Sequence, residues 1–407
     1  MTQVLLTSQI ITNSALEILE NDLVITSTVN RKYEDRFAVS GGKIGDTVNI
    51  RLPDRALVSN GAALQVQEEN QQSVALTINY QKQIGISFTG ADLVLKIDEF
   101  EENILKPRIS QLAADIDFTV ATDSYSQIYN SVGTPGTTPS TPEVLLAGMQ
   151  KLDEMAAMRP NRYWAVNPAA NASLVSGMKG LLNPVTTISD QFKTGMMGVG
   201  VLGLKQIAMT QSIPNHTTGS RTSTPGTILV NGTVSTQGQA TLSFDGDSGS
   251  ATVTKGDVFT VAGVYSVNPQ TRATTGSLQQ FVVTAASTAS GGAWTDVTIQ
   301  PPMFTSSNAL ATINAFPQDG AAVTFMGAAS TAYPQNLMYH RDAITFATVD
   351  DFLPQGGVEM AARSVHNGIS MRMVKQFNIQ NDQDPCRIDV LFGSKVIRPQ
   401  MAVRVWG

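Results

Sequence analysis

Apolar residues recur every three or four positions in two stretches of the first 130 residues, a spacing typical of amphipathic helices. In the first stretch Ser14 and Glu17 fit a capping box, in which the serine begins the helix and the glutamate binds back to its backbone. We therefore expect a helix from Ser14, and its position near the N-terminus leaves open whether it packs on its own core or on a neighbouring molecule. Its apolar stripe comprises Ala15, Leu16, Ile18, Leu19 and Leu23.

The second stretch predicts a longer helix between about residues 91 and 130. Acidic side chains between Asp98 and Glu102 lie at its start, where they suit the helix dipole. Pro107 must either kink this helix or open a second one at its first turn. About 30 residues at about 1.5 Å each make a spine of roughly 45 Å. Its apolar positions are Phe100, Ile104, Ile109, Leu112, Ile116 and Val120.

Between these helices, apolar and polar residues alternate with period two in residues 44–52 and in residues 74–80, which predicts two strands. The segment that joins them is polar, so we expect a long hairpin over residues 41–89 with a polar end. Such a ribbon is marginal alone and needs a partner surface. The alternating apolar residues are Ile44, Val48, Ile50 and Leu52 on one strand and Val74, Leu76 and Ile78 on the other.

Helices and strands mix in the next part of the chain. Thr141 precedes Pro142 as the cap of a new helix, because proline suits the first helical position. Arg162–Val166 predicts a strand, and Asn167 begins a further helix. This order of elements indicates an α+β domain.

The composition changes at about residue 221, and residues 221–330 hold only eight charged residues among threonine, serine, glycine and valine. Residues 228–234 predict a two-residue hairpin, because Asn231-Gly232 tolerates the positive φ angles of its turn. Short strands with turns between them indicate a small β-barrel or sandwich, inserted into the α+β domain. The further strands are expected at residues 240–244, 258–261, 280–284, 297–300 and 323–326.

The composition of the whole chain excludes several classes of protein. Its 407 residues are 42% hydrophobic and carry a net charge of −6, which excludes a disordered chain and disfavours nucleic-acid binding through a basic face. The single cysteine, Cys386, excludes an intrachain disulfide and a cysteine zinc site. The N-terminus lacks a basic signal-peptide region and no apolar run approaches a membrane span, so we expect a soluble protein without an export signal.

The motifs that could indicate a binding or catalytic site lack the neighbouring residues that such a site requires. Residues 198–203 match the dinucleotide fingerprint G-x-G-x-x-G, but no strand precedes them and no acidic residue follows at the required distance. Residues 245–250 begin like a calcium loop, yet Ser250 and Gly256 occupy the positions that need glycine and glutamate. His216, His340 and His366 lie far apart, which favours structural roles. We expect no active site, no cofactor and no metal, and we interpret Cys386 as a buried free thiol.

Several segments together resemble the major coat proteins of tailed bacteriophages, in particular those of the P-twenty-two group. The resemblance is carried in order along nearly the whole chain by residues 164–168 (WAVNP), 187–198 (TISDQFKTGMMG), 213–219 (IPNHTTG), 340–343 (HRDA), 370–372 (SMR), 387–393 (RIDVLFG) and 398–399 (RP).

The resemblance implies a Hong Kong 97 type capsid fold with an inserted β-barrel domain. Its parts would be an N-terminal arm (residues 1–40), an E-loop hairpin (41–89), a peripheral domain with the spine helix (90–139), an axial domain in two parts (140–220 and 331–407, the second shared with the peripheral domain) and the barrel (221–330).

The resemblance also implies a function, which is to form the icosahedral shell around a double-stranded DNA genome. The expected partners are copies of the chain in hexamers and pentamers, a portal protein and a separate scaffolding protein, since the first helix begins too early for a fused one. The protein would be a virion component assembled in the bacterial cytoplasm, and not an enzyme. Tentative contacts between subunits are Arg51, Arg55, Glu68 and Glu69.

Two other classes of function stay open on the sequence alone. A β-rich module that binds carbohydrate or a cell surface would fit the inserted domain, although the missing export signal disfavours it. An enzyme would need polar residues that cluster only in the folded chain.

Overall fold

A computed structural model describes residues 8–32, 45–88 without 59, 63, 65 and 68–70, 101–177, 198–199, 203–380 without 355, 357 and 359, and 384–407. The chain forms two compact units. The first comprises Met1–Ile50, Ser73–Val120 and Ile344–Lys395, and the second comprises Arg51–Gln72, Ala121–Ala343 and Val396–Gly407.

The first unit is built on an antiparallel sheet whose long central strand is β22 (Asp384–Val396). On one side β22 pairs with β3 (Tyr80–Phe88). On the other it pairs with β21 (Ile369–Lys375), which pairs in turn with β20 (Met360–His366). The short strand β19 (Ile344–Thr348) also pairs with β22. Sequence reasoning had not resolved these C-terminal strands.

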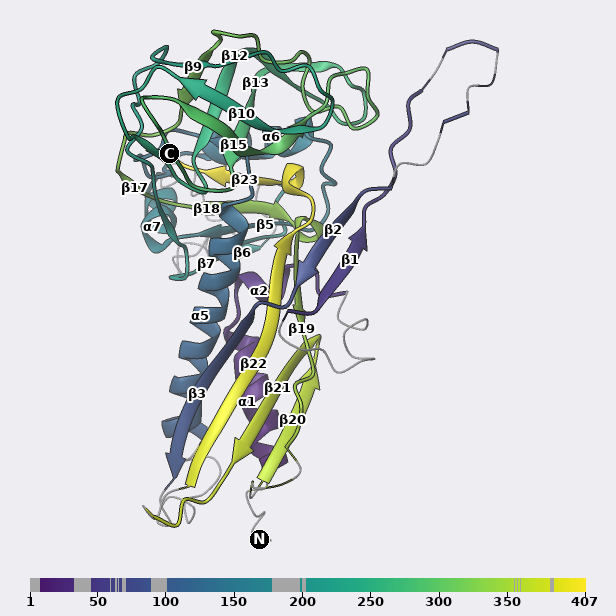
Figure 1. Ribbon diagram of the computed structural model, residues 1–407. Coiled ribbons are helices and arrows are strands. Elements are labelled where there is room, and N and C mark those ends of the chain that lie inside the picture. Colours follow the sequence, from purple (N-terminus) through teal and green to yellow (C-terminus); the bar gives the residue numbers. More distant parts are fainter. Residues whose placement is uncertain are drawn as a thin grey trace. The chain divides into compact units, whose positions relative to one another are not determined.

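Helix α1 (Ser8–Asp22) packs along β20 and β21 of this sheet, as Figure 1 shows. The helix therefore begins before Ser14, and the predicted cap at Ser14 is wrong. The reason is that Thr12, which is polar but fully buried, starts the inward stripe one turn earlier. This stripe is buried within the subunit, which corrects the alternative that it packs on a neighbouring molecule. Its other buried members are Ala15, Leu16, Leu19 and Leu23.

The predicted hairpin is shorter than expected. Strands β1 (Thr47–Arg51) and β2 (Ser73–Thr77) pair with each other, but the chain then turns, and β3 joins β22 in the main sheet. The crossing brings the Thr77 carbonyl so close to Gly393 that a Cβ there would lie 2.3 Å from it, which only glycine avoids.

The predicted spine begins with a π-helical turn, η2 (Glu101–Leu105), followed by α5 (Lys106–Tyr125). Pro107 lies in the first turn of α5, so the expectation that it opens a second helix is confirmed. The chain passes from the first unit to the second within α5. The acidic segment ahead of η2 lies outside the described residues. In the first unit the short helix α2 (Ile25–Thr28) follows α1.

A six-stranded sheet forms the body of the second unit, in the order β4-β23-β18-β5-β7-β6. The predicted strand at residues 162–166 is confirmed as β5, and α6 begins at Pro142 with Thr141 as its cap residue, although the Thr141 side chain makes no capping hydrogen bond. The members are β4 (Ser131–Val132), β23 (Ala402–Val405), β18 (Asn336–His340), β5 (Arg162–Val166), β7 (Gln206–Met209) and β6 (Gly198–Val199), with α6 (Pro142–Glu154) and α7 (Pro168–Gly177).

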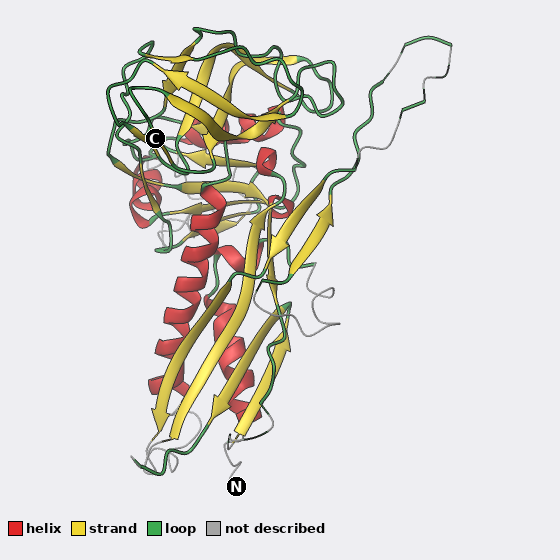
Figure 2. Cartoon of the chain, viewed as in Figure 1, coloured by secondary structure: helices red, strands yellow, loops and turns green. Residues whose placement is uncertain are grey.

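The inserted domain is a closed β-barrel, which confirms the barrel expected from the sequence (Figure 2). The chain leaves and re-enters the body through a two-stranded ribbon of β8 (Asn215–Thr217) and β17 (Ala332–Pro334). Strands β11 (Thr252–Val253) and β14 (Ser287–Thr288) form a second ribbon. Around the barrel the order is β10 (Gln239–Asp245), β15 (Trp294–Met303), β13 (Thr274–Val283), β12 (Val258–Val267), β16 (Ala322–Phe325) and β9 (Ile228–Val230).

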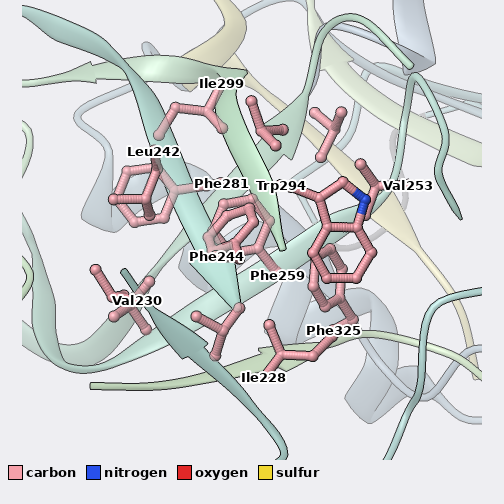
Figure 3. Packing of buried hydrophobic residues seen from close by; sticks show 14 of the residues in the cluster. Ile228, Val230, Leu242, Phe244, Val253, Phe259, Phe281, Trp294, Ile299 and Phe325 are labelled. Atoms are coloured by element: carbon pink, nitrogen blue, oxygen red, sulfur yellow. The ribbon is translucent and has the colours of Figure 1, made fainter. Parts of the chain in front are cut away.

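The interior of the barrel is filled by aliphatic and aromatic side chains, which Figure 3 shows in close packing. The ring of Phe244 lies edge-on to that of Phe259, with centroids 5.2 Å apart, and Phe281 stacks on Phe259 at 5.6 Å. Phe325 and Trp294 complete the cluster. The barrel is thus a packed core of its own.

One local prediction in the barrel is wrong. Asn231-Gly232 does not close a hairpin, because β9 pairs with β10 and β16 and the residues after Gly232 form no strand. Gly232 does take a positive φ of 92°, but its N–H is bound by the Asp319 carboxylate, which directs the chain away from β9.

Candidate functional site: the exposed loop and the barrel junction

The loop between β1 and β2 is the most exposed apolar segment of the described chain. At its base Leu52 N–H donates to Gln72 O, and further out Gln67 binds the backbone of Leu57. The loop joins the end of β1 to the start of β2 (Figure 1). Three side chains in it are 82–89% exposed, namely Val58, Leu64 and Val66. The predicted polar end of the hairpin therefore also exposes three large apolar side chains.

By contrast, the base of the hairpin is covered within the subunit. Ile50, Leu76 and Ile78 are at most 1% exposed, although sequence reasoning expected this ribbon to need a partner surface. The apolar side chains of the hairpin strands are therefore covered within the subunit, whereas those of the loop are exposed.

The structure describes two of the four charged residues predicted to contact a neighbouring subunit. Arg51 is exposed and its guanidinium reaches Gln71 Oε1 at 3.5 Å. Arg55 is half-buried, and burial lowers its pKa, with the charge of Arg398 adding to the effect and Tyr129 opposing it. Arg55 therefore faces its own chain in part. Glu68 and Glu69 lie outside the described residues, and the pairing of all four across subunits stays a prediction.

Within the second unit, the barrel is joined to the body by a buried polar network centred on Asp257. This carboxylate, in the turn before β12, accepts hydrogen bonds from Gly219 N–H at 3.1 Å and Thr254 N–H at 2.9 Å, and His216 Nε2 lies 3.0 Å from it. Arg221 Nε lies 4.0 Å away. Burial alone would raise the pKa of Asp257, but the hydrogen bond with His216 and the charge of Arg221 lower it below its ordinary value.

Two fully buried arginines flank this carboxylate. Arg221 lies over the Phe325 ring at 4.5 Å and donates to the carbonyls of Met326 and Gly327. Arg404 lies over the Tyr125 ring and donates to Gly256 O at 2.7 Å. Burial lowers the pKa of Arg404 to about 9, so the side chain stays charged at neutral pH.

A second group of contacts joins strand β13 and the turn after β12 to the body. Gln280 on β13 bonds both backbone groups of Ser131 on β4, accepting from N–H at 2.7 Å and donating to O at 2.9 Å. On α6, Lys151 Nζ reaches Ser277 Oγ at 3.3 Å, and Glu154 O accepts from Asn268 Nδ2 at 2.7 Å. The orientation of the barrel on the body is thus fixed by directional bonds as well as by apolar contact.

In the first unit, Asp117 on α5 ties down the segment that follows α1. Its buried carboxylate accepts from the N–H groups of Val24, Ile25 and Thr26 and from the Thr26 hydroxyl, at 2.6–3.1 Å. Burial nevertheless raises the pKa of Asp117, against the effect of these hydrogen bonds. A helix start is a natural site for a carboxylate, because its N–H groups have no helical partners.

Sequence reasoning missed Asp117 and Asp257, since the only signal was an acidic residue within an otherwise apolar stretch. Each of the three histidines lies beside a carboxylate: His216 by Asp257, His340 by Asp342 and His366 by Glu20. Cys386 is buried and unpaired, as predicted, and burial raises its pKa to about 12.

The part of the chain that the structure describes contains no cluster of His, Cys, Asp or Glu suited to a metal. The calcium-like segment is a turn in which Asp247 accepts from Thr222 N–H and Ser248 N–H. Among the described residues, no helix combines the length and apolar character needed to cross a membrane.

Each of the two units buries a core of its own, whereas the described part of the loop between β1 and β2 exposes large apolar side chains. The family model of the P22 coat protein, gene protein 5, matches residues 1–407, and the chain belongs to this family. It is a major capsid protein of a bacteriophage, a structural virion component that assembles with copies of itself and is not an enzyme. The alternative of a carbohydrate- or surface-binding module has no support.

Solved phage structures resemble the chain at low identity. The matches include a chain of Mycobacterium phage Che8 (13% identity, 94% of this chain and 90% of that chain, TM-score 0.46). They also include the capsid of the Cyanophage P-SCSP1u (11% identity, 90% of this chain and 84% of that chain, TM-score 0.42). A further match is the capsid of Ralstonia phage GP4 (9% identity, 91% of this chain and 86% of that chain, TM-score 0.44). No curated protein matches the sequence.

Proposed function

We propose that the protein forms, as hexamers and pentamers, an icosahedral shell of the Hong Kong 97 type around the double-stranded DNA genome of a tailed phage. The observation that carries the proposal is the exposed loop of a chain that belongs to a coat-protein family, since its apolar side chains lack cover in the single subunit. A net charge of −6 also suits a lining that must hold DNA without binding it tightly.

The contact surface that we propose is the loop at residues 52–72, with a second copy of the chain as its occupant. Copies of the chain are the partner that family membership supports, and the loop carries charges of both signs, so that it can pair with itself or with another face of the same protein. Arg51, Arg55, Glu68 and Glu69 would supply charge pairs at the rim. Each exposed pair would contribute about 0–1 kcal/mol, and the shell would repeat it in every subunit.

The finer assignments of the parts rest on the resemblance to phage coat proteins. We propose the divisions at residues 40, 139, 220 and 330 as limits of the arm, peripheral domain, axial domain and barrel. We end the E-loop before β3 and not at residue 89, because β3 pairs with β22 in the main sheet. A separate scaffolding protein, a portal protein and assembly in the host cytoplasm belong to the same proposal.

Electron microscopy of the purified protein tests the proposal directly. Closed shells or polymers are expected, with uniform size when a scaffolding protein is present. A chain that stays monomeric at high concentration, with or without scaffold, would exclude it. A double variant, Val58→Ser with Val66→Ser, tests the loop, because it removes exposed apolar surface without altering a buried side chain. This variant should fold normally and assemble poorly.

A further inference from the structure

The exposed loop is closed on itself by one side chain. Gln67 Oε1 accepts from Leu57 N–H at 2.8 Å, and Gln67 Nε2 donates to Leu57 O at 2.5 Å. A side-chain amide thus forms the paired bonds that a backbone amide would form in a β-ladder. Neither residue belongs to a strand, so this contact is not an extension of the β1–β2 ladder.

The closed segment coincides with the apolar part of the loop. Val58, Leu64 and Val66 all lie between Leu57 and Gln67. In an open chain these side chains would sample many positions, and a partner would have to order them on binding. A contact that fixes both ends of the segment beforehand reduces that entropic cost.

We propose that Gln67 is a positioning residue for assembly, which holds Val58, Leu64 and Val66 in the positions that a second copy of the chain binds. This inference rests on the loop contact proposed above and adds a residue that acts before the partner arrives. Gln67 itself need not touch the partner.

The test compares two glutamines of the same loop. Gln67→Met keeps the length of the side chain but removes both bonds to Leu57. Gln72→Met is the matched control, because Gln72 serves the loop through its backbone carbonyl, which the substitution preserves. Three quantities are measured for each full-length variant: the exchange rate of the Leu57 amide in free subunits, the thermal midpoint of those subunits, and the subunit concentration at which half the protein assembles.

For Gln67→Met we expect faster exchange at Leu57, an unchanged thermal midpoint, and a concentration for half-assembly about fivefold higher, the effect of losing about one net hydrogen bond. Gln72→Met should match the unaltered chain in all three. If Gln67→Met lowers the thermal midpoint of the free subunits as well as impairing assembly, Gln67 has a role in folding and the proposal is overturned.

Two results separate this inference from the proposed contact. If Val58→Ser with Val66→Ser impairs assembly while Gln67→Met does not, the loop is a contact but Gln67 does not position it. If neither variant affects assembly, the loop contact itself fails and the inference falls with it.

Discussion

At the scale of single residues, two buried carboxylates organise the chain, and each gathers donors from segments distant in sequence. Asp117 binds the backbone of residues 24–26, and Asp257 binds groups from residues 216–221 as well as its own turn. Burying a carboxylate without such donors would cost free energy. Each of these two carboxylates can therefore be buried only when the segments that donate to it are correctly packed.

Removing the Asp117 carboxylate should destabilise the first unit. Asp117→Ala leaves the donors of residues 24–26 buried without their acceptor, which we expect to lower the free energy of unfolding by about 2–4 kcal/mol. Asp115→Ala is the control on the same helix, since Asp115 is exposed and only pairs with Lys82 across 2.8 Å, worth about 0–1 kcal/mol. Chemical denaturation of both variants measures the difference. Equal losses would contradict the role given to Asp117.

The lowered pKa of Asp257 predicts how stability changes with pH. A carboxylate whose pKa is lower in the folded state stabilises the fold above its ordinary value of 3.8, and this contribution is lost as the pH falls below 3.8. Asp257→Asn should lower the free energy of unfolding by about 3 kcal/mol at pH 7. This difference from the unaltered chain should narrow as the pH falls below 3.8. Denaturation midpoints between pH 2.5 and 7 measure this gap. The control Asp296→Asn, at an exposed site, should show no such gap. A constant gap for Asp257→Asn would refute the prediction.

At the scale of elements, the sequence predicted those whose pattern is local. Five barrel strands, β5 and the starts of α6 and α5 follow from period-two alternation or from a proline at the first turn, which need no distant partner. The limits of the other elements depend on contacts between residues far apart in sequence. Gly393 in β22 has no side chain, so the backbone at Thr77 can cross close to it between β2 and β3. The Asp319 carboxylate binds Gly232 N–H and directs the chain away from β9. Thr12 begins the buried stripe of α1 because the sheet covers it.

The barrel should fold as an isolated fragment of residues 221–330. Its aromatic cluster is drawn entirely from its own strands, so the fragment keeps its core when the body is absent. We expect β-type circular dichroism and a cooperative thermal transition. Phe259→Ala should lower the stability of the fragment by about 3–5 kcal/mol, because Phe259 contacts three other rings of the cluster. Random-coil spectra would contradict the proposed limits of the domain.

At the scale of the whole molecule, the structure separates what the subunit needs for folding from what it offers to its neighbours. The first unit buries the inward stripe of α1 and the inward side chains of the hairpin base, and the second unit contains a closed barrel and a six-stranded sheet. Composition could predict that some surface is left for partners, but it could not show which. The sequence suggested the N-terminal helix and the whole hairpin, whereas three of the four most exposed large apolar side chains of the described residues lie in the loop between β1 and β2.

This separation predicts where assembly changes hydrogen exchange. Backbone amides of the described part of residues 52–72 should exchange quickly in free subunits, because few of them are hydrogen-bonded, and should become protected in assembled shells. Strand β3 and helix α1 should be protected in both states, since each packs within its own unit. Mass spectrometry of peptides from free and assembled protein measures all three segments at once, with the barrel strand β12 as an internal reference. If the loop exchanges at the same rate in both states, it contacts no neighbour. If α1 gains protection on assembly, the helix serves a neighbouring subunit after all, and burial of its stripe against β20 and β21 is not its only role.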